Sequence, residues 1–464
     1  MKAFDARRKY LDRYAADHKW TLRCSSDTSI KAAVVIPALR ESGRIFRTLA
    51  TIADNPSDEL EHTLVICVVN NRADIDCAYR MDNILTLELL RGIIAGRAPS
   101  KERVSPEIRK DIQKIIDQGL RVAYVDASTA GRELPEGEGV GLARKIGFDR
   151  AIERIDDPGA TLYSLDADTE VDDRYLATHR HALADSGAVA SVCAFRHQNA
   201  ETEIAQRAVD DYEIFLRHYV AGLLWAGSPY GHHSIGSTFA CTAGGYVTVR
   251  GMPRRKAGED FYFLNKIAKT GCVARAHGTT VRPSARLSCR TPFGTGRIVA
   301  SAGENRRKIL LYDFRVFVIL KKWLACVESS LETDEKRLIM AARGIDLALS
   351  RFLEKQNFPL AWSRIRSNSR DGKMELRRFH EWFDGFRTMK LVHYLTDNRW
   401  PRLEAGQGVS VMLKLLERSV EHVTSAAPAS REKAEAVILW LIGLEDELAA
   451  CRNRRSDRIR SFQD

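Results

Sequence analysis

The chain has no long apolar run. Its longest obvious candidate, Ala436 to Leu444, is far shorter than the roughly 20 apolar residues that cross a bilayer, and it ends at Glu445. The N-terminal stretch MKAFDARRKYLDRYAADHKW is charged throughout and contains no apolar signal-peptide core. We therefore expect neither a membrane span nor a secretion signal, and we expect a cytoplasmic protein.

Cysteine is scarce and has no metal-binding spacing. The nine cysteines are scattered, odd in number and never spaced as CxxC. This pattern argues against a disulfide framework and against a zinc site, so a reducing cytoplasm is the simpler setting.

A basic excess is present without any nucleic-acid recognition motif. The net charge is +11, and residues 305–464 carry 30 Lys and Arg against 22 Asp and Glu, which is 30 − 22 = +8. A solvated helical surface explains this excess, with peripheral contact at the anionic inner face of a membrane as the alternative. Because no aromatic ladder accompanies the charge, we expect no nucleic-acid partner.

Length and periodicity indicate more than one domain. At 464 residues, with 44% hydrophobic and 29% charged residues, the chain is long enough to bury two cores. Residues 1–30 are expected to form an N-terminal helical extension, and residues 31–304 an α/β domain. A helical insertion is expected at about 75–119, where Ser105 and Pro106 are typical of a helix start. Helical spacing continues through residues 305–464, which predicts a C-terminal helical domain without a visible catalytic motif.

Two strand-to-loop transitions mark the first half of the α/β part. The run KAAVVIP, residues 31–37, is β-branched and leads through Glu41 into a helical pattern. The run Leu64 to Val69 ends at Asn70 and Asn71. Loops after such strands face the ligand in open α/β sheets.

A third transition carries two carboxylates. The run ending at Leu165 is followed by Asp166 and Asp168, which are separated by one residue. Side chains alternate along a strand, so both carboxylates can face the same way and share one hard cation such as Mn²⁺ or Mg²⁺. Such a cation can hold a diphosphate.

Two helix starts, one before and one after this acidic pair, complete the pattern. Residues 141–150, GLARKIGFDR, open an amphipathic helix. Glu259 and Asp260 begin another, which is expected to stop near Gly271. Capping alone could explain these two acids; a helix N-terminus should also keep Asp260 ionised at neutral pH.

The ordered series resembles the GT-A glycosyltransferases of the family 2 type over roughly residues 31–300. The resemblance implies an α/β fold with a Rossmann-like mixed sheet flanked by helices, and transfer of a sugar from a nucleotide-diphospho-sugar to an acceptor hydroxyl. The Q-x-x-R-W signature of processive relatives is absent, which favours transfer of a single sugar. The matching segments are VVIPALRE (34–41), VICVVNNRAD (65–74), GLARKIGFDRAI (141–152), LDADT (165–169) and GED (258–260).

The resemblance also implies roles for single residues. Asp260 would be the general base, beside Glu259, and transfer would invert the anomeric carbon. A divalent metal would bind Asp166 and Asp168, with His277 as a third ligand. Asn70 and Asn71 stand where relatives carry an Asp that accepts from uracil, so a preference for UDP is not indicated. Contacts to the donor would come from Pro37, Ala38, Glu41, Asn70, Asn71, Gly141, Arg144 and Asp166.

Other functions stay open at this point. A nucleotidyltransferase that builds sugar nucleotides would share the fold, but VVIPALRESG lacks the Gly-rich basic loop that it needs. A catalytically inactive sugar-nucleotide-binding protein would carry the same residues. The basic segment Arg254 to Lys256 could clamp a diphosphate or an anionic acceptor, or form an ordinary surface loop. The acceptor and the oligomeric state cannot be read from the sequence.

Overall fold

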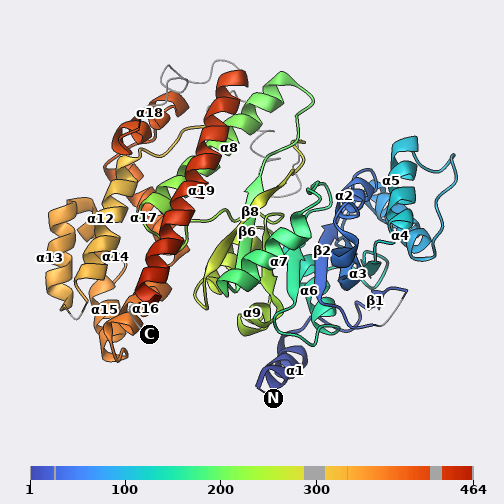
Figure 1. Cartoon of the computed structure of the whole chain (residues 1–464), viewed down its shortest axis with the longest axis horizontal. Coiled ribbons are helices and arrows are strands. Elements are labelled where there is room, and N and C mark those ends of the chain that lie inside the picture. Colours follow the sequence, from blue (N-terminus) through green and yellow to red (C-terminus); the bar gives the residue numbers. More distant parts are fainter. Residues whose placement is uncertain (1, 26–27, 287–308, 332, 419–430, 462–464) are drawn as a thin grey trace. The chain divides into compact units, whose positions relative to one another are not determined.

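The computed structural model describes residues 2–25, 28–286, 309–331, 333–418 and 431–461 (Figure 1). The chain divides into two compact units. Unit 1 comprises Met1–Ala200 and Ser234–Arg297, and unit 2 comprises Glu201–His233 and Ile298–Asp464.

Unit 1 is built on one eight-stranded mixed sheet with the strand order β1-β4-β3-β2-β5-β7-β6-β8. Strands β2, β3, β4 and β5 run parallel, whereas β1 and β7 run antiparallel to their neighbours. The predicted fold class, a mixed α/β sheet followed by a helical C-terminal region, is confirmed. The strands are β1 (Leu22–Arg23), β2 (Ala32–Ala38), β3 (Thr63–Asn70), β4 (Val122–Ala127), β5 (Thr161–Ser164), β6 (Ala190–Phe195), β7 (Phe239–Thr242) and β8 (Val273–Val281).

The central strands are buried along their whole length. Every residue of β2 and of β3 is buried, as expected for parallel strands covered on both faces. β2 continues through Pro37 to Ala38 and pairs with β3 along this length. The carboxyl ends of β2, β3 and β5 therefore meet at one edge of the sheet.

Helices flank this sheet, and α6 packs on its centre (Figure 1). Gly147 allows this close approach, because a Cβ there would lie 2.3 Å from Cγ1 of Val35. The helices of unit 1 are α1 (Lys2–Tyr14), α2 (Ile45–Ile52), α3 (Ser57–His62), α4 (Cys77–Ile94), α5 (Pro106–Asp117), α6 (Val140–Ile152), α7 (Tyr175–Ser186), α9 (Ala243–Thr248) and α10 (Glu259–Ile267).

The predicted helical insertion consists of α4 and α5, between β3 and β4. The start of α5 is as predicted: Oγ of Ser105 accepts a hydrogen bond from the Ile108 amide at 3.4 Å, and a proline occupies the first turn.

The N-terminal segment packs against unit 1 and contributes a strand to its sheet. β1 pairs with β4 and so adds a strand to the sheet. Asp149 of α6 is fully buried, and its carboxylate accepts from the Tyr10 hydroxyl at 2.5 Å and from the Ala16 amide at 2.6 Å. These contacts attach α1 and the residues after it to α6.

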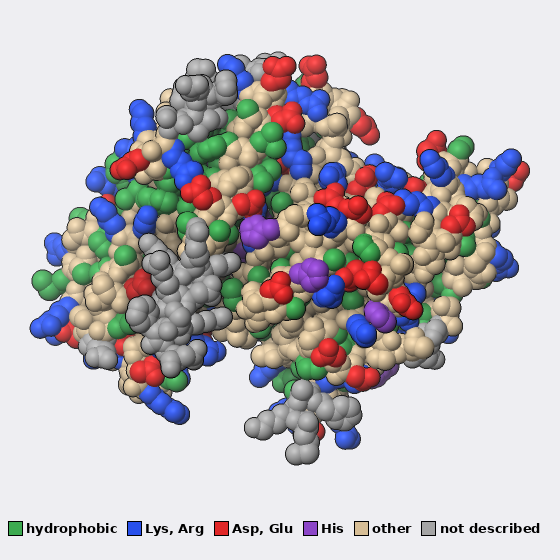
Figure 2. Space-filling view, viewed as in Figure 1, with side chains coloured by type: hydrophobic (Ala, Val, Ile, Leu, Met, Phe, Trp, Pro, Cys, Tyr) green, Lys and Arg blue, Asp and Glu red, His purple; other side chains and the backbone are tan. Residues whose placement is uncertain are grey.

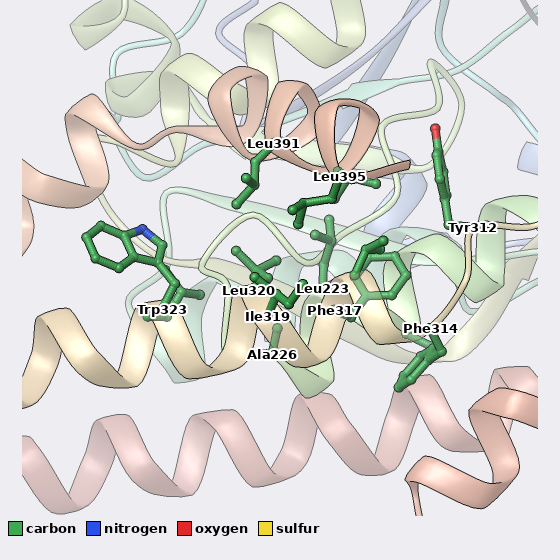
Figure 3. Close-up of a cluster of buried hydrophobic side chains, with 14 of the residues drawn as sticks. Leu223, Ala226, Tyr312, Phe314, Phe317, Ile319, Leu320, Trp323, Leu391 and Leu395 are labelled. Carbon is green, nitrogen blue, oxygen red and sulfur yellow. The ribbon is translucent and has the colours of Figure 1, made fainter. Parts of the chain in front are cut away.

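Unit 2 is helical and has its own apolar core. In Figure 3, Phe317 and Leu320 of α12 point toward Leu391 and Leu395 of α17, with Leu223 of α8 close by. The helices of unit 2 are α8 (Glu203–Trp225), α12 (Arg315–Ser329), α13 (Glu335–Ile345), α14 (Leu347–Lys355), α15 (Phe358–Ser367), α16 (Gly372–Trp382), α17 (Gly385–Asn398), α18 (Ala405–Leu415) and α19 (Arg431–Ser461).

The compact units differ from the predicted boundary at residue 304. α8 lies within the predicted α/β segment, yet it packs with α12, α18 and α19. Gly222 explains part of this packing, because a Cβ there would lie 2.5 Å from the Phe317 ring.

The surface and the helices bear on the membrane question. Within the described residues, no helix is long and apolar enough to cross a membrane. On the face in Figure 2, Lys and Arg side chains are interspersed with Asp and Glu rather than gathered in one patch.

Candidate active site

The predicted site lies where the order of the strands reverses. β3 and β4 lie on one side of β2, and β5 lies on the other. Ligands of open α/β sheets bind outside the carboxyl ends of the strands at such a point. Glu41 follows β2 there, and Asp166 and Asp168 follow β5.

Arg144 of α6 connects three groups at this edge. Its Nε donates to Oε1 of Glu259 at 2.9 Å, its Nη1 donates to Oγ of Ser164 at 2.6 Å, and its Nη2 pairs with Oδ1 of Asp166. The Arg144 side chain is 3% exposed. Burial disfavours its charge, but the carboxylates of Asp166 and Glu259 raise the pKa of Arg144 above its ordinary value. Arg144, which the sequence predicts to contact the donor, therefore binds two carboxylates here and fixes their positions.

Ser237, which sequence reasoning missed, holds the other side of Asp166, and Gly236 beside it packs against Arg144. Oγ of Ser237 donates to Oδ2 of Asp166 at 2.5 Å, and Ser164 donates to the Gly236 carbonyl at 2.6 Å. Gly236 leaves the room that Arg144 occupies, since a Cβ there would lie 2.2 Å from Nη2 of Arg144. The glycine in HHSIGS was the available signal, because glycine often marks a close approach.

Arg286, which sequence reasoning also missed, binds the carboxylates of Glu41 and Asp168. Its guanidinium binds both carboxylate oxygens of Glu41, and its Nη2 lies 2.8 Å from Oδ2 of Asp168. Burial, and then the charge of Asp168, raise the pKa of Glu41 to about 8 despite Arg286. Burial likewise raises the pKa of Asp168. The edge of the sheet thus concentrates negative charge, which a further cation would relieve.

Glu259 and Asp260 begin α10, as predicted. Gly258 precedes them with φ of 74°, a left-handed conformation that suits glycine. Oδ1 of Asp260 accepts from the Phe261 amide at 2.7 Å. Burial, and then the neighbouring charge of Glu259, raise the pKa of Asp260 to about 7. The helix N-terminus favours the ionised carboxylate of Asp260, and burial acts in the opposite direction by raising its pKa.

Asn70 and Asn71 are buried and their amides bind the protein itself. Nδ2 of Asn70 donates to the Ala38 and Val68 carbonyls at 3.2 and 3.1 Å. Asn71 donates to the Ser128 carbonyl at 3.2 Å. Their side chains therefore shape the loops at this edge of the sheet.

Three other residues were predicted to contact the nucleotide-sugar, and the structure shows where their backbone lies. Pro37 and Ala38 lie at the carboxyl end of β2. Gly141 touches the basic loop, since a Cβ there would lie 2.7 Å from the Arg255 carbonyl oxygen. In that loop, Arg254 pairs with Glu138 at 2.7 Å.

The predicted third metal ligand is not brought to the two aspartates. His277 is exposed on β8. Among the described residues, no three His, Cys, Asp or Glu side chains gather in a group that could hold a metal ion. Asp166, Asp168 and His277 therefore do not form a complete protein ligand set in this part of the chain.

Comparisons with known proteins extend the picture only to distant structures. No protein-family model matches the chain, and no curated protein does either. S. aureus TarS 1-349 is 11% identical with a TM-score of 0.35, covering 78% of this chain and 92% of its own. The mannosyltransferase PcManGT from Pyrobaculum calidifontis, in complex with GDP-Man and Mn²⁺, is 12% identical with a TM-score of 0.35, covering 97% and 95%. GalNAc-T7, with UDP, GalNAc and Mn²⁺, is 14% identical with a TM-score of 0.34, covering 84% and 62%.

Similarity at this level does not identify a function. The mixed sheet is consistent with the GT-A fold expected from the sequence, and the chemistry of the site must be inferred from its own residues.

Proposed function

We propose that the protein is a glycosyltransferase that moves one sugar from a nucleotide-diphospho-sugar to an acceptor hydroxyl. The observation that carries this proposal is the convergence of Asp166, Asp168, Glu259 and Asp260 at the switch point of the sheet. Arg144 ties two of these acids together, and Arg286 holds a third. A fold alone would not support this function, whereas a set of converging charged groups does.

The two aspartates fit a divalent cation by their chemistry. Mn²⁺ and Mg²⁺ prefer oxygen ligands, and Mg²⁺ in particular is commonly bound by one or two carboxylates together with substrate phosphates and water. Two protein carboxylates are therefore sufficient when a diphosphate supplies the remaining oxygens. Asp166 and Asp168 would hold the ion, which would act as a Lewis acid on the leaving diphosphate.

The chain's own residues provide the rest. Arg144 and Ser237 fix the Asp166 carboxylate, while Arg286 fixes Asp168 and Glu41. Asp260 would accept the proton of the attacking hydroxyl, and its pKa of about 7 suits a base at neutral pH. A base that acts on the face opposite the leaving group implies inversion at the anomeric carbon.

A thermal-shift panel tests the proposal. The full-length protein is heated with UDP, GDP, dTDP, CDP and ADP sugars, with and without Mn²⁺. A ligand at 100 times its Kd stabilises the folded state by about 2.7 kcal/mol, so the correct donor should raise Tm clearly. Release of the nucleoside diphosphate from that donor, with water as acceptor, would separate an enzyme from a binding protein.

Variants connect this shift to the site. The double variant Asp166→Ala, Asp168→Ala should fold and lose the Mn²⁺-dependent shift. Asp173→Ala is the matched control, because Asp173 is exposed a few residues further along the chain. A Mn²⁺-dependent shift that survives in the double variant would refute the metal assignment. No shift with any donor would refute the proposed function.

A further inference from the structure

The loop after β2 directs two successive side chains to different partners. Glu41 binds Arg286, which also contacts Asp168, so it lies at the metal end of the site. Arg40 instead lies over Tyr79 of the insertion helix α4. Under the proposed function, the metal end holds the diphosphate, and the nucleoside must extend away from it along the carboxyl edge of the sheet.

Arg40 is held in an uncommon backbone conformation. Its φ is 56°, in the left-handed region that residues other than glycine seldom adopt. Its amide donates to Oδ1 of Asn83 at 3.0 Å. Non-glycine residues in this region are often found at functional sites, where the surroundings maintain the conformation.

α4 supplies those surroundings. Asn83 is 1% exposed, and its Nδ2 donates to the Asn70 carbonyl at 3.1 Å and to Oδ1 of Asn71 at 2.8 Å. Asp82 accepts from the amide and the hydroxyl of Ser42 at 3.1 and 2.6 Å. The insertion helix therefore fixes the loops after both β2 and β3, and Arg40 belongs to the first of these loops.

The Arg40 guanidinium is held against an aromatic ring, and its hydrogen-bond donors remain available for a ligand. Its Cζ lies 4.7 Å from the centre of the Tyr79 ring, the side chain is exposed, and among the described residues no hydrogen bond or ion pair uses the guanidinium. Stacking restricts the movement of the guanidinium and leaves its N–H donors available.

We propose that Arg40 and Tyr79 form the nucleobase subsite of the nucleotide-sugar donor, and that Arg40 selects guanine. This inference rests on the proposed function. A guanidinium has only donors, and it matches the adjacent O6 and N7 acceptors of guanine. Adenine presents an amino group in place of O6, so it opposes the same donors. Asn70 and Asn71, bound to the protein, offer no carboxylate for a uracil N–H.

Isothermal titration with GDP, ADP, UDP, CDP and inorganic pyrophosphate, each with Mn²⁺, tests the subsite. We expect wild type to bind GDP roughly 5- to 150-fold more tightly than ADP, the range for one good bidentate base contact. Arg40→Asn removes the guanidinium but keeps a residue that tolerates the left-handed conformation. It should abolish this preference and leave pyrophosphate binding unchanged.

Two further variants separate the ring from the charge. Tyr79→Phe keeps the stacking surface and should retain the preference, whereas Tyr79→Ala should weaken GDP binding by roughly 2- to 5-fold through loss of the cation–π contact. Arg97→Asn, at an exposed position after α4, is the matched control and should bind like wild type. Urea unfolding of each variant confirms that it is folded.

The outcomes distinguish the inference from the function on which it rests. If wild type binds neither pyrophosphate nor any nucleotide, the proposed function fails. If wild type binds nucleotides but Arg40→Asn weakens GDP and ADP equally, or changes neither, the subsite is assigned wrongly. A wild-type preference for UDP or CDP overturns the selection of guanine.

Discussion

Replacing Asp260 with Asn should abolish activity and at the same time stabilise the protein. Asn keeps the shape of the side chain but cannot accept a proton, and loss of one general base lowers rates by about 10²–10⁴. For wild type, a base with a pKa of about 7 requires kcat/KM to fall tenfold per pH unit below neutrality. Only about a tenth of such a carboxyl is ionised at pH 6.

The stability effect follows from the direction of the pKa shift. The pKa of Asp260 rises from 3.8 to about 7 on folding, so the folded state binds this proton more tightly than the unfolded chain. Wild-type stability therefore carries a penalty that appears as pH rises from about 4 and is complete above about pH 7. Three pKa units correspond to about 4 kcal/mol as an upper limit. Because Asp260 is half-buried, solvent screening reduces the expected gain in Asp260→Asn to about 1–2 kcal/mol.

Two assays on the same protein test this reasoning. Urea unfolding with EDTA at pH 8 and pH 4 should show the Asn variant more stable at pH 8, with the difference closing at pH 4. Asp185→Asn, an exposed acid on α7, should change little at either pH. Donor hydrolysis with Mn²⁺ from pH 5 to 8 gives the rate profile. Near-normal hydrolysis by Asp260→Asn would assign the base elsewhere, and a destabilised variant would indicate that Asp260 mainly caps α10.

The remaining predictions concern packing. Arg144→Met leaves Glu259 and Asp166 without their cation and should lower the free energy of unfolding in urea by about 3–5 kcal/mol. Arg144→Lys should lower it less. A loss below about 1 kcal/mol for the Met variant would show that the pairing is dispensable. Gly222→Ala should lose about 1–3 kcal/mol against the Phe317 ring, while Gly443→Ala, which meets no neighbouring atom within 4 Å, should gain up to about 1 kcal/mol. A fragment ending at residue 304 keeps α8 without α12 and α19, so we expect it to aggregate in size-exclusion chromatography; a monomeric fragment would contradict this.

Sequence reasoning located the strand ends but not all of the contacts between them. Asp166 and Glu41 could be placed at one edge because parallel strands direct their carboxyl ends the same way. Arg144 was expected to contact the donor, but its pairing with two carboxylates was not anticipated. The pattern around a long side chain indicates its helix and approximate face, whereas its partner depends on which distant segments fold against it.

Arg286 and Asn83 show the same limit more strongly. Arg286 follows the last strand of the sheet and contacts Asp168, far away in the sequence. Asn83 lies inside an ordinary helical pattern, so nothing local distinguishes it from a solvated polar residue. Their roles exist only in the assembled fold, where buried polar groups must find hydrogen-bond partners.

Glu445, at the end of an apolar run, illustrates a long-range contact that the sequence pattern does not reveal. In the sequence, this acid ends the run Ala436 to Leu444, and an acid in that position is typical of a solvated surface. In the structure, Glu445 is fully buried, and its carboxylate lies 3.3 Å from Nη1 of Arg217 on α8 and 2.9 Å from Nε2 of His233. A buried carboxylate requires a cationic partner, since an unpaired one would cost several kcal/mol, roughly 3–5 when one partner is removed. The charges on α8 and α19 are therefore complementary, and they place α8 with the C-terminal helices although the chain order places it inside the α/β part.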